Sequence, residues 1–230
     1  MAVARCTNIL TFAKKLQLIR IPQQNDWVVF LLIGCIFLYV FMLRSLKRDS
    51  SVLEFLLQKF PDSANNFLSG IIISLVFSLV FSALISPNIP VVPKFVTDYR
   101  LLGYELNKFG FTFMVVTLYY ILRTILSYLF FAGTSAGTRW ELFSFVASKF
   151  YFCFSVVLMV FCVLQFYFPL DREVMLQVFF YSIIALFSGK LLYYIFHKDR
   201  VLPQKWYYKF LYICTLQIIP VLVLWKLLFI

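Results

Sequence analysis

Six apolar segments divide the chain, each close to or above the length that crosses a membrane. They lie at about 27–43, 67–85, 109–131, 143–168, 174–196 and 210–229. A membrane-spanning helix needs about 20 predominantly apolar residues. Only a tight loop around Asp171 separates the fourth segment from the fifth, so we expect these two to form an antiparallel hairpin. The pattern predicts an all-α fold, a polytopic membrane helical bundle of about six transmembrane helices in a single membrane domain over residues 1–230.

Two shorter segments have the periodicity of helices that lie on a membrane surface. In residues 8–21, apolar side chains recur on one helical stripe, with Lys14 and Lys15 away from it. Ser51 and Glu54 have the spacing of a capping box, which predicts a short helix from Val52 to Phe60. Both segments are interpreted as interfacial helices.

Composition agrees with a membrane protein, because 63% of the residues are hydrophobic and 13% are charged. The chain has 21 Lys and Arg against 10 Asp and Glu. In a multi-pass protein this positive excess indicates cytoplasmic loops and contacts with lipid headgroups and not nucleic-acid binding. The first apolar segment begins only at Trp27 and no cleavage pattern follows it, so we expect no cleavable signal peptide. Lys and Arg are divided almost evenly between the two sides. They barely favour termini outside the cytoplasm.

Arg123 lies near the middle of the third segment, among Ile121, Leu122, Ile125 and Leu126. A charged side chain at the centre of a spanning helix costs about 2.5–3.5 kcal/mol on insertion scales, so it should face protein or water. All 10 acidic residues fall in loops or at segment ends. The sequence therefore offers Arg123 no carboxylate at its own depth.

The sixth segment offers neutral acceptors instead, at Gln217 and Pro220. Proline has no N–H, so the carbonyl of Leu216, four residues earlier, loses its helical partner. A guanidinium carries five N–H donors and could take this carbonyl together with the Gln217 oxygen. We therefore predict contact between the third and sixth segments. Arg123 would be either a structural clamp, or a snorkelling side chain, or a site for an external anion.

Small residues follow one ridge of the second segment at a four-residue interval: Gly70, Ser74, Ser78, Ser82 and Ser86. Such ridges let a neighbouring helix approach closely, which makes helix packing the favoured interpretation. A polar path for a substrate is the alternative.

The residues of the common intramembrane enzymes are missing from the sequence. It has no pair of buried carboxylates, no H-E-x-x-H cluster and no placed base beside a serine, so no catalytic residue is predicted. No metal site or cofactor is expected either. Five cysteines without C-x-x-C spacing indicate free thiols: Cys6, Cys35, Cys153, Cys162 and Cys214. Lys190 and Lys226, near segment ends, are expected to snorkel, and His197 to face headgroups.

The run "YYKFLYICTLQIIPVLVLWKLL", Tyr207 to Leu228, resembles the closing signature of an uncharacterised family of bacterial multi-pass inner-membrane proteins, a domain of unknown function with a LYxCTLxxxP-type span. This resemblance implies a cell inner membrane location in a Gram-negative envelope, and no activity. It also implies a basic residue in the third segment, matched by Arg123, and an acidic residue where this chain has Gln217. The neutral glutamine fits structural pairing better than proton chemistry.

Two hypotheses for function follow, and an intramembrane enzyme ranks third. The first is a non-enzymatic accessory or scaffold subunit of an envelope complex, which packs against other membrane-protein helices through the ridge of the second segment and its aromatic faces. The second is a carrier or binding protein for an anionic lipid or lipid-linked precursor that uses Arg123. In both, the lipid bilayer is a partner and nucleic acid is not.

Overall fold

The computed structural model describes residues 26–46, 51–58, 66–89, 107–134, 137–168, 172–196 and 205–229, and every regular element in these ranges is helical. The predicted all-α fold is confirmed. In chain order the elements are α2 (Asp26–Phe41), η1 (Met42–Leu46), α3 (Val52–Leu57), α4 (Asn66–Ile85), η3 (Ser86–Asn88), α6 (Lys108–Gly133), α7 (Thr138–Tyr167), α8 (Arg172–Phe196), α9 (Trp206–Leu211), η4 (Tyr212–Ile218) and α10 (Ile219–Phe229).

Within these ranges, six helical stretches are long and apolar enough to cross a membrane. The chain is therefore a multi-pass membrane protein. The first stretch joins α2 to η1, and the last joins α9, η4 and α10. Helix α7 begins at Thr138, before the apolar segment predicted from about 143. The hydropathy pattern missed this first turn because it contains polar residues such as Glu141. The predicted interfacial helix at 8–21 lies outside the described residues.

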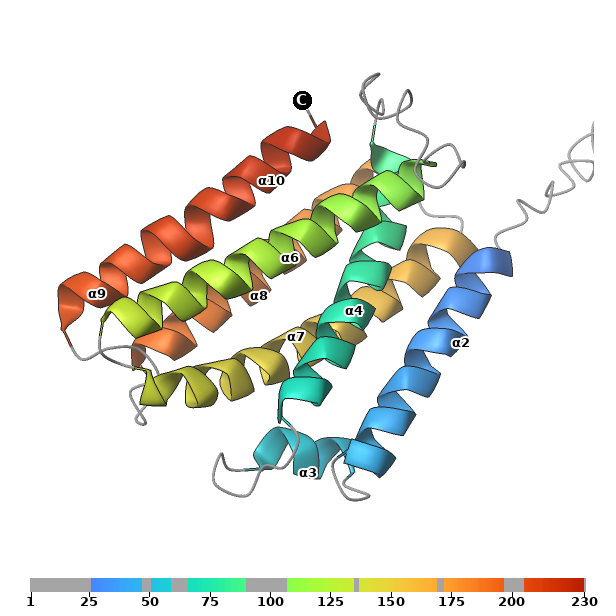
Figure 1. Cartoon of the computed structure of the whole chain (residues 1–230). Helices are drawn as coiled ribbons and strands as arrows, with labels where there is room; N and C mark the ends of the chain where they lie inside the picture. The colour runs from blue at the N-terminus through green and yellow to red at the C-terminus, as the bar shows by residue number, and fades with distance from the viewer. Residues whose placement is uncertain are drawn as a thin grey trace, which may run out of the picture.

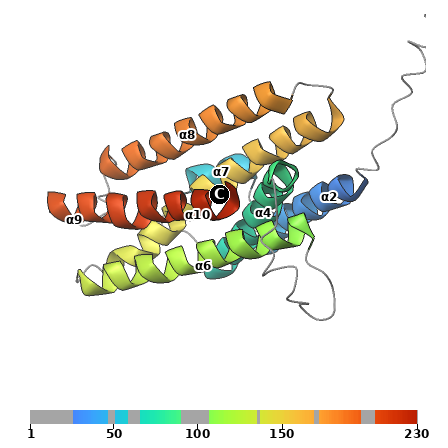
Figure 2. The same ribbon diagram turned by 90° about the horizontal axis from the view of Figure 1, so that it is seen from above.

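Helix α4 is the centre of the bundle. It packs against α2, α6 and α7, and the views in Figure 1 and Figure 2 place it between these helices. Half of its most apolar window is buried inside the protein, against 11% for α8. Helix α8 packs against α7, and α10 packs along α6 on the other side of the bundle from α2. Side chains that α4, α6 and α7 direct toward one another are thus shielded from lipid.

The capping box predicted for α3 is confirmed. The Ser51 hydroxyl accepts from the Glu54 backbone N–H at 3.3 Å, and Glu54 Oε2 accepts from the Ser51 N–H at 2.7 Å. These two bonds fix the start of the helix. Helix α3 ends at Leu57, and the remaining predicted residues, from 59 on, lie outside the described residues.

Three lysines close the C-terminal ends of neighbouring helices. Lys149 of α7 donates to the carbonyls of Leu56 and Gln58 at the end of α3. Lys108 of α6 donates to the Ile89 carbonyl beyond η3 at 3.2 Å, and Lys209 of α9 donates to the Ile195 carbonyl of α8 at 3.4 Å. The last carbonyls of a helix lack intrahelical partners and carry partial negative charge, so a lysine satisfies both needs. These contacts join α7 to the end of α3, α6 to the segment after η3, and α9 to the end of α8.

Candidate functional site: a buried cationic cluster beside a polar pocket

Arg123 points into the bundle from the buried face of α6. Only 6% of the residue is exposed, and the same face carries Val116, Ser127 and Phe131 at helical spacing. Its neighbours Leu122 and Ile125 are exposed on the outer side of the helix. A charged group in the hydrocarbon layer must find polar partners, so the apolar outer residues and the cation separate onto opposite faces of the same helix.

Two neutral acceptors from different helices receive the Arg123 guanidinium. Nη2 donates to Gln217 Oε1 of η4 at 3.0 Å, and Nη1 donates to the Tyr151 hydroxyl of α7. The third and sixth segments thus meet at this side chain. The Leu216 carbonyl accepts no hydrogen bond from Arg123 among the described residues. Tyr151, which carried no signal in the sequence, takes that place.

Gln217 is fully buried and lies in a π-helical turn directly before Pro220. The Ile219 N–H bonds the Cys214 carbonyl, five residues back, instead of the carbonyl four residues back. Pro220 cannot donate an N–H, and the wider π turn ends at Ile218, shortly before the proline. This geometry carries Gln217 inward, where its Nε2 donates to the Tyr212 hydroxyl at 2.7 Å. The hydroxyl oxygens of Tyr212 and Ser127 are in turn 3.5 Å apart.

Aromatic packing holds this part of the sixth segment in place. The Phe143 ring of α7 lies 5.5 Å from the Tyr212 ring, 5.5 Å from Tyr194 and 5.1 Å from Phe131, measured between centroids. These four rings come from α6, α7, α8 and η4. Tilted and edge-to-face ring pairs of this kind stabilise the fold beyond the effect of the apolar area that they bury. These ring contacts hold the Tyr212 hydroxyl where it accepts from Gln217 Nε2.

Lys190 is a second buried cation, and here the expectation of snorkelling was wrong. Only 2% of the residue is exposed; its Nζ donates to the Tyr151 hydroxyl at 3.3 Å and lies 4.5 Å from the centre of the Tyr151 ring. It lies more than a turn before the end of α8, on the side facing α7. From there the bundle interior offers a closer polar partner than the membrane surface. Lys226, by contrast, is exposed.

The two cations share one neutral oxygen and have no carboxylate near them in the described part of the chain. The acidic side chains described there are Asp26, Glu54 and Glu141, and all three are exposed. The Tyr194 hydroxyl, on the same helix as Lys190, is buried and has no hydrogen-bond partner among the residues that the structure describes. The cluster Arg123, Tyr151, Lys190 and Gln217, which we call the cationic cluster, therefore holds positive charge that the described residues leave unbalanced.

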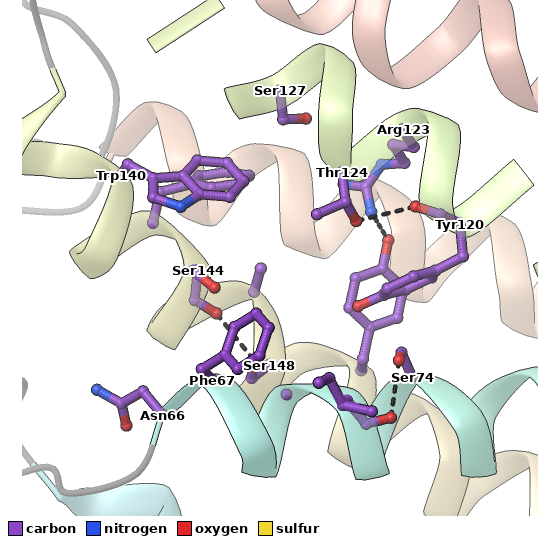
Figure 3. A pocket seen from close by; sticks show the side chains of 15 residues that line it. Asn66, Phe67, Ser74, Tyr120, Arg123, Thr124, Ser127, Trp140, Ser144 and Ser148 are labelled. Atoms are coloured by element: carbon purple, nitrogen blue, oxygen red, sulfur yellow. Dashed lines mark hydrogen bonds between the residues drawn. The ribbon is translucent and has the colours of Figure 1, made fainter. Parts of the chain in front are cut away.

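A polar pocket of about 180 Å³ opens beside the cationic cluster, between α4, α6 and α7. Figure 3 shows Arg123 directed into it from α6, Ser74 rising from α4, and Ser144 and Ser148 on α7. Trp140 lies toward one end. Hydroxyl groups from three helices surround the space. An anion that entered this pocket would meet the guanidinium directly.

The predicted ridge of small residues divides between the pocket and the core. Gly70 and Ser74 line the pocket, whereas Ser78, Ser82 and Ser86 are buried within the bundle. A Cβ added at Gly70 would lie 3.3 Å from Ser148 Oγ, so α4 and α7 approach closely there. Contacts of α4 with α7 continue along its length, where the Cys162 thiol faces the Val80 carbonyl at 3.8 Å.

An apolar pocket of about 210 Å³ lies on the other side of Tyr151. Its walls come from α4, α6, α7, α8 and α10 and include Phe77, Phe81 and Phe154, with Lys190 as the charged member. Tyr151 lines both pockets. The cationic cluster thus lies between a hydroxyl-lined space and a hydrocarbon-lined one.

No metal site accompanies this arrangement in the described ranges, where no three of His, Cys, Asp and Glu lie close enough to hold an ion. Cys35, Cys153, Cys162 and Cys214 are free thiols.

Comparison with known families matches residues 27–228 to a family described as a domain of unknown function (DUF4271). The chain belongs to this family. The match covers all six apolar segments and agrees with the resemblance seen in the sequence at the level of an uncharacterised family. The bacterial envelope and the inner membrane stay predictions. Neither the curated proteins nor the solved structures gave a match.

Proposed function

We propose that this membrane protein binds an anionic lipid, holding the lipid's phosphate group in the polar pocket beside Arg123. The observation that carries the proposal is the pair of buried basic side chains, Arg123 and Lys190, that meet at the neutral Tyr151 hydroxyl with no carboxylate beside them among the described residues. Buried charge is costly unless a counter-charge and hydrogen bonds offset it. A bound phosphate would supply both.

The pocket supports the proposal by its position. It gives access to Arg123 from the half of the bundle that contains the start of α4 and of α7 and the end of α6. A phosphate oxygen that replaced the Tyr151 hydroxyl would lie within hydrogen-bond reach of both cations, since both donate to that one oxygen. Guanidinium groups suit phosphate because their paired N–H donors match its geometry.

A scaffold role, the first of the two hypotheses from the sequence, becomes the alternative, and the ridge on α4 does not favour it. Ser78, Ser82 and Ser86 are at most 8% exposed, because they face helices of the same chain. They are therefore not available to a helix of another protein. The exposed aromatic and aliphatic side chains on the outer faces of α2, α8 and α10 fit lipid as well as they fit a partner.

Native mass spectrometry of the detergent-purified protein tests the proposal, with the Arg123→Gln variant beside the wild type. We expect the wild type to retain a phosphate-containing lipid. The variant should bind it about tenfold to a hundredfold less, the effect of losing charge-assisted hydrogen bonds. Lys226→Gln, which removes an exposed cation, is the matched control and should bind normally.

Two further measurements separate the alternatives. Soluble glycerol phosphate should compete poorly with the lipid; equal competition would mean that the site takes a free anion. Equal lipid retention by the wild type and Arg123→Gln would contradict the proposal. A stoichiometric protein partner in the same spectra, without bound lipid, would favour the scaffold role.

A further inference from the structure

Three hydroxyl groups that line the polar pocket donate their hydrogens to backbone carbonyls of their own helices. Ser74 of α4 donates to the Ile71 carbonyl at 2.8 Å, Thr124 of α6 donates to the Tyr120 carbonyl at 2.9 Å, and Ser148 of α7 donates to the Ser144 carbonyl at 2.9 Å. All three side chains line the pocket, and Figure 3 shows them around its interior. The same arrangement thus recurs on the three helices that form the pocket walls.

A hydroxyl has one hydrogen and two acceptor lone pairs. When the hydrogen is held by a backbone carbonyl, the side chain can offer only its lone pairs to a ligand. Ser74, Thr124 and Ser148 therefore present acceptors to the pocket. Acceptors repel the oxygens of a phosphate and attract O–H or N–H groups. Arg123 supplies charged donors for a phosphate at the end of the pocket that adjoins the cationic cluster.

We propose that the bound lipid carries a hydroxylated headgroup, with its phosphate at Arg123 and its hydroxyl groups donating to Ser74, Thr124 and Ser148. This inference rests on the proposed function and adds the headgroup class. A choline headgroup has no hydrogen to donate. An ethanolamine headgroup donates but places an ammonium group near Arg123 and Lys190, which repel it. A polyol or sugar on the phosphate satisfies both the acceptors and the cations.

The apolar pocket beyond Tyr151 suits the hydrocarbon part of the proposed lipid. An apolar cavity of about 150 Å³ already holds a benzene ring, and this one measures about 210 Å³. It can hold part of a hydrocarbon chain. Because Tyr151 lines both pockets, a lipid with its phosphate at the cationic cluster has polar walls on one side and apolar walls on the other. This distribution favours a lipid over a soluble sugar phosphate.

Phosphatidylglycerol and phosphatidylethanol provide a matched pair of probes. Both are phosphodiesters with the same charge, and only the first has headgroup hydroxyls. Each is added to the purified protein in mixed micelles of detergent and phosphatidylcholine, and the bound fraction is measured by native mass spectrometry. We expect the wild type to prefer phosphatidylglycerol by about threefold to tenfold, the effect of one hydrogen bond gained.

Thr124→Val and Ser148→Ala remove acceptors from the pocket without changing charge. Each should bring the preference toward one and leave phosphatidylethanol binding unchanged. Thr215→Val is the control, because the Thr215 hydroxyl also donates to its own helix, at the Leu211 carbonyl, but the residue does not line the pocket. It should keep the wild-type preference. Thermal unfolding checks that each variant is folded.

The outcomes separate this inference from the function on which it rests. Equal binding of the two lipids by the wild type, with both lost in Arg123→Gln, would overturn the headgroup class and leave the phosphate site standing. A preference that persists in Thr124→Val and Ser148→Ala would also overturn it. Binding of both lipids that survives in Arg123→Gln would overturn the proposed function itself.

Discussion

Tyr151 is the residue on which the buried charges depend. Its hydroxyl accepts from both Arg123 and Lys190, and its ring lies 5.2 Å from the Arg123 guanidinium carbon and 4.5 Å from Lys190 Nζ. A cation over an aromatic face is attracted by the ring as well as by the hydroxyl. One neutral side chain thus solvates two cations in a layer that contains no bulk water.

Replacement of Tyr151 by Phe should destabilise the protein, because it leaves donors of Arg123 and Lys190 unsatisfied while the ring stays. An unsatisfied buried donor costs about 1–3 kcal/mol, more when charged. Tyr194→Phe is the matched control, since its buried hydroxyl has no partner among the described residues, and it should change the stability by less than about 0.5 kcal/mol. Reversible unfolding in mixed micelles measures both. Equal stabilities for the two variants would contradict the role given to Tyr151.

At the scale of elements, short helices depend on contacts from their neighbours. Helix α3 has only six residues and is too short to be stable alone in water. Ser51 and Glu54 cap its start, and Lys149 of α7 binds its last carbonyls. Phe55 packs against Phe152 of α7, with ring centroids 5.3 Å apart. Two contacts with α7 therefore fix α3 against the bundle.

Lys149→Met should loosen the end of α3 without unfolding the bundle, because methionine keeps much of the apolar stem and removes the charge. Hydrogen exchange at the Phe55 and Gln58 amides, which bond the carbonyls of Ser51 and Glu54, should be about twofold to fivefold faster. This range follows from the contribution of a cation at a helix C-terminus, about 0.3–1 kcal/mol. Lys226→Met is the control and should leave exchange in α3 unchanged. Unaltered exchange in Lys149→Met would contradict the role given to Lys149.

At the scale of the whole molecule, six crossings place alternate connections on opposite sides of the membrane. The end of α2 with η1, the start of α4 and the start of α7 lie at one end of the bundle, where α3 is also found (Figure 1). The end of α4 and the start of α6 lie at the other. The polar pocket belongs to the first end, so the headgroup of a bound lipid would come from that leaflet.

Single cysteines at exposed positions test this arrangement. In a background from which reactive native thiols have been removed, Ser51→Cys and Gly137→Cys should react with a membrane-impermeant maleimide from the same side. Pro87→Cys should react only from the opposite side. Labelling of residues 51 and 87 from one side would contradict the crossing by α4, the spanning helix that lies between them.

The class of fold followed from the amino-acid sequence, because the length of an apolar segment is the physical requirement for crossing a bilayer. Six segments of that length predicted six helices, and a cation without a carboxylate at its depth predicted that Arg123 would face protein. The capping box at Ser51 was also visible, since capping is local. Gln217 could be proposed because Arg123 needed a neutral acceptor. Each of these inferences depends on neighbours along one helix or on the solvent.

Which helices meet around Arg123 could be known only from the packing of the folded chain. Tyr151 and Lys190 lie on α7 and α8, within long apolar helices in which neither has a distinguishing spacing. Their role depends on the rotation of those helices about their axes, which packing sets and hydropathy does not encode. The same reason explains the error at Lys190. A lysine near the end of a span can snorkel to the surface or turn inward, and the Tyr151 hydroxyl at 3.3 Å, supplied by another helix, favours the inward position.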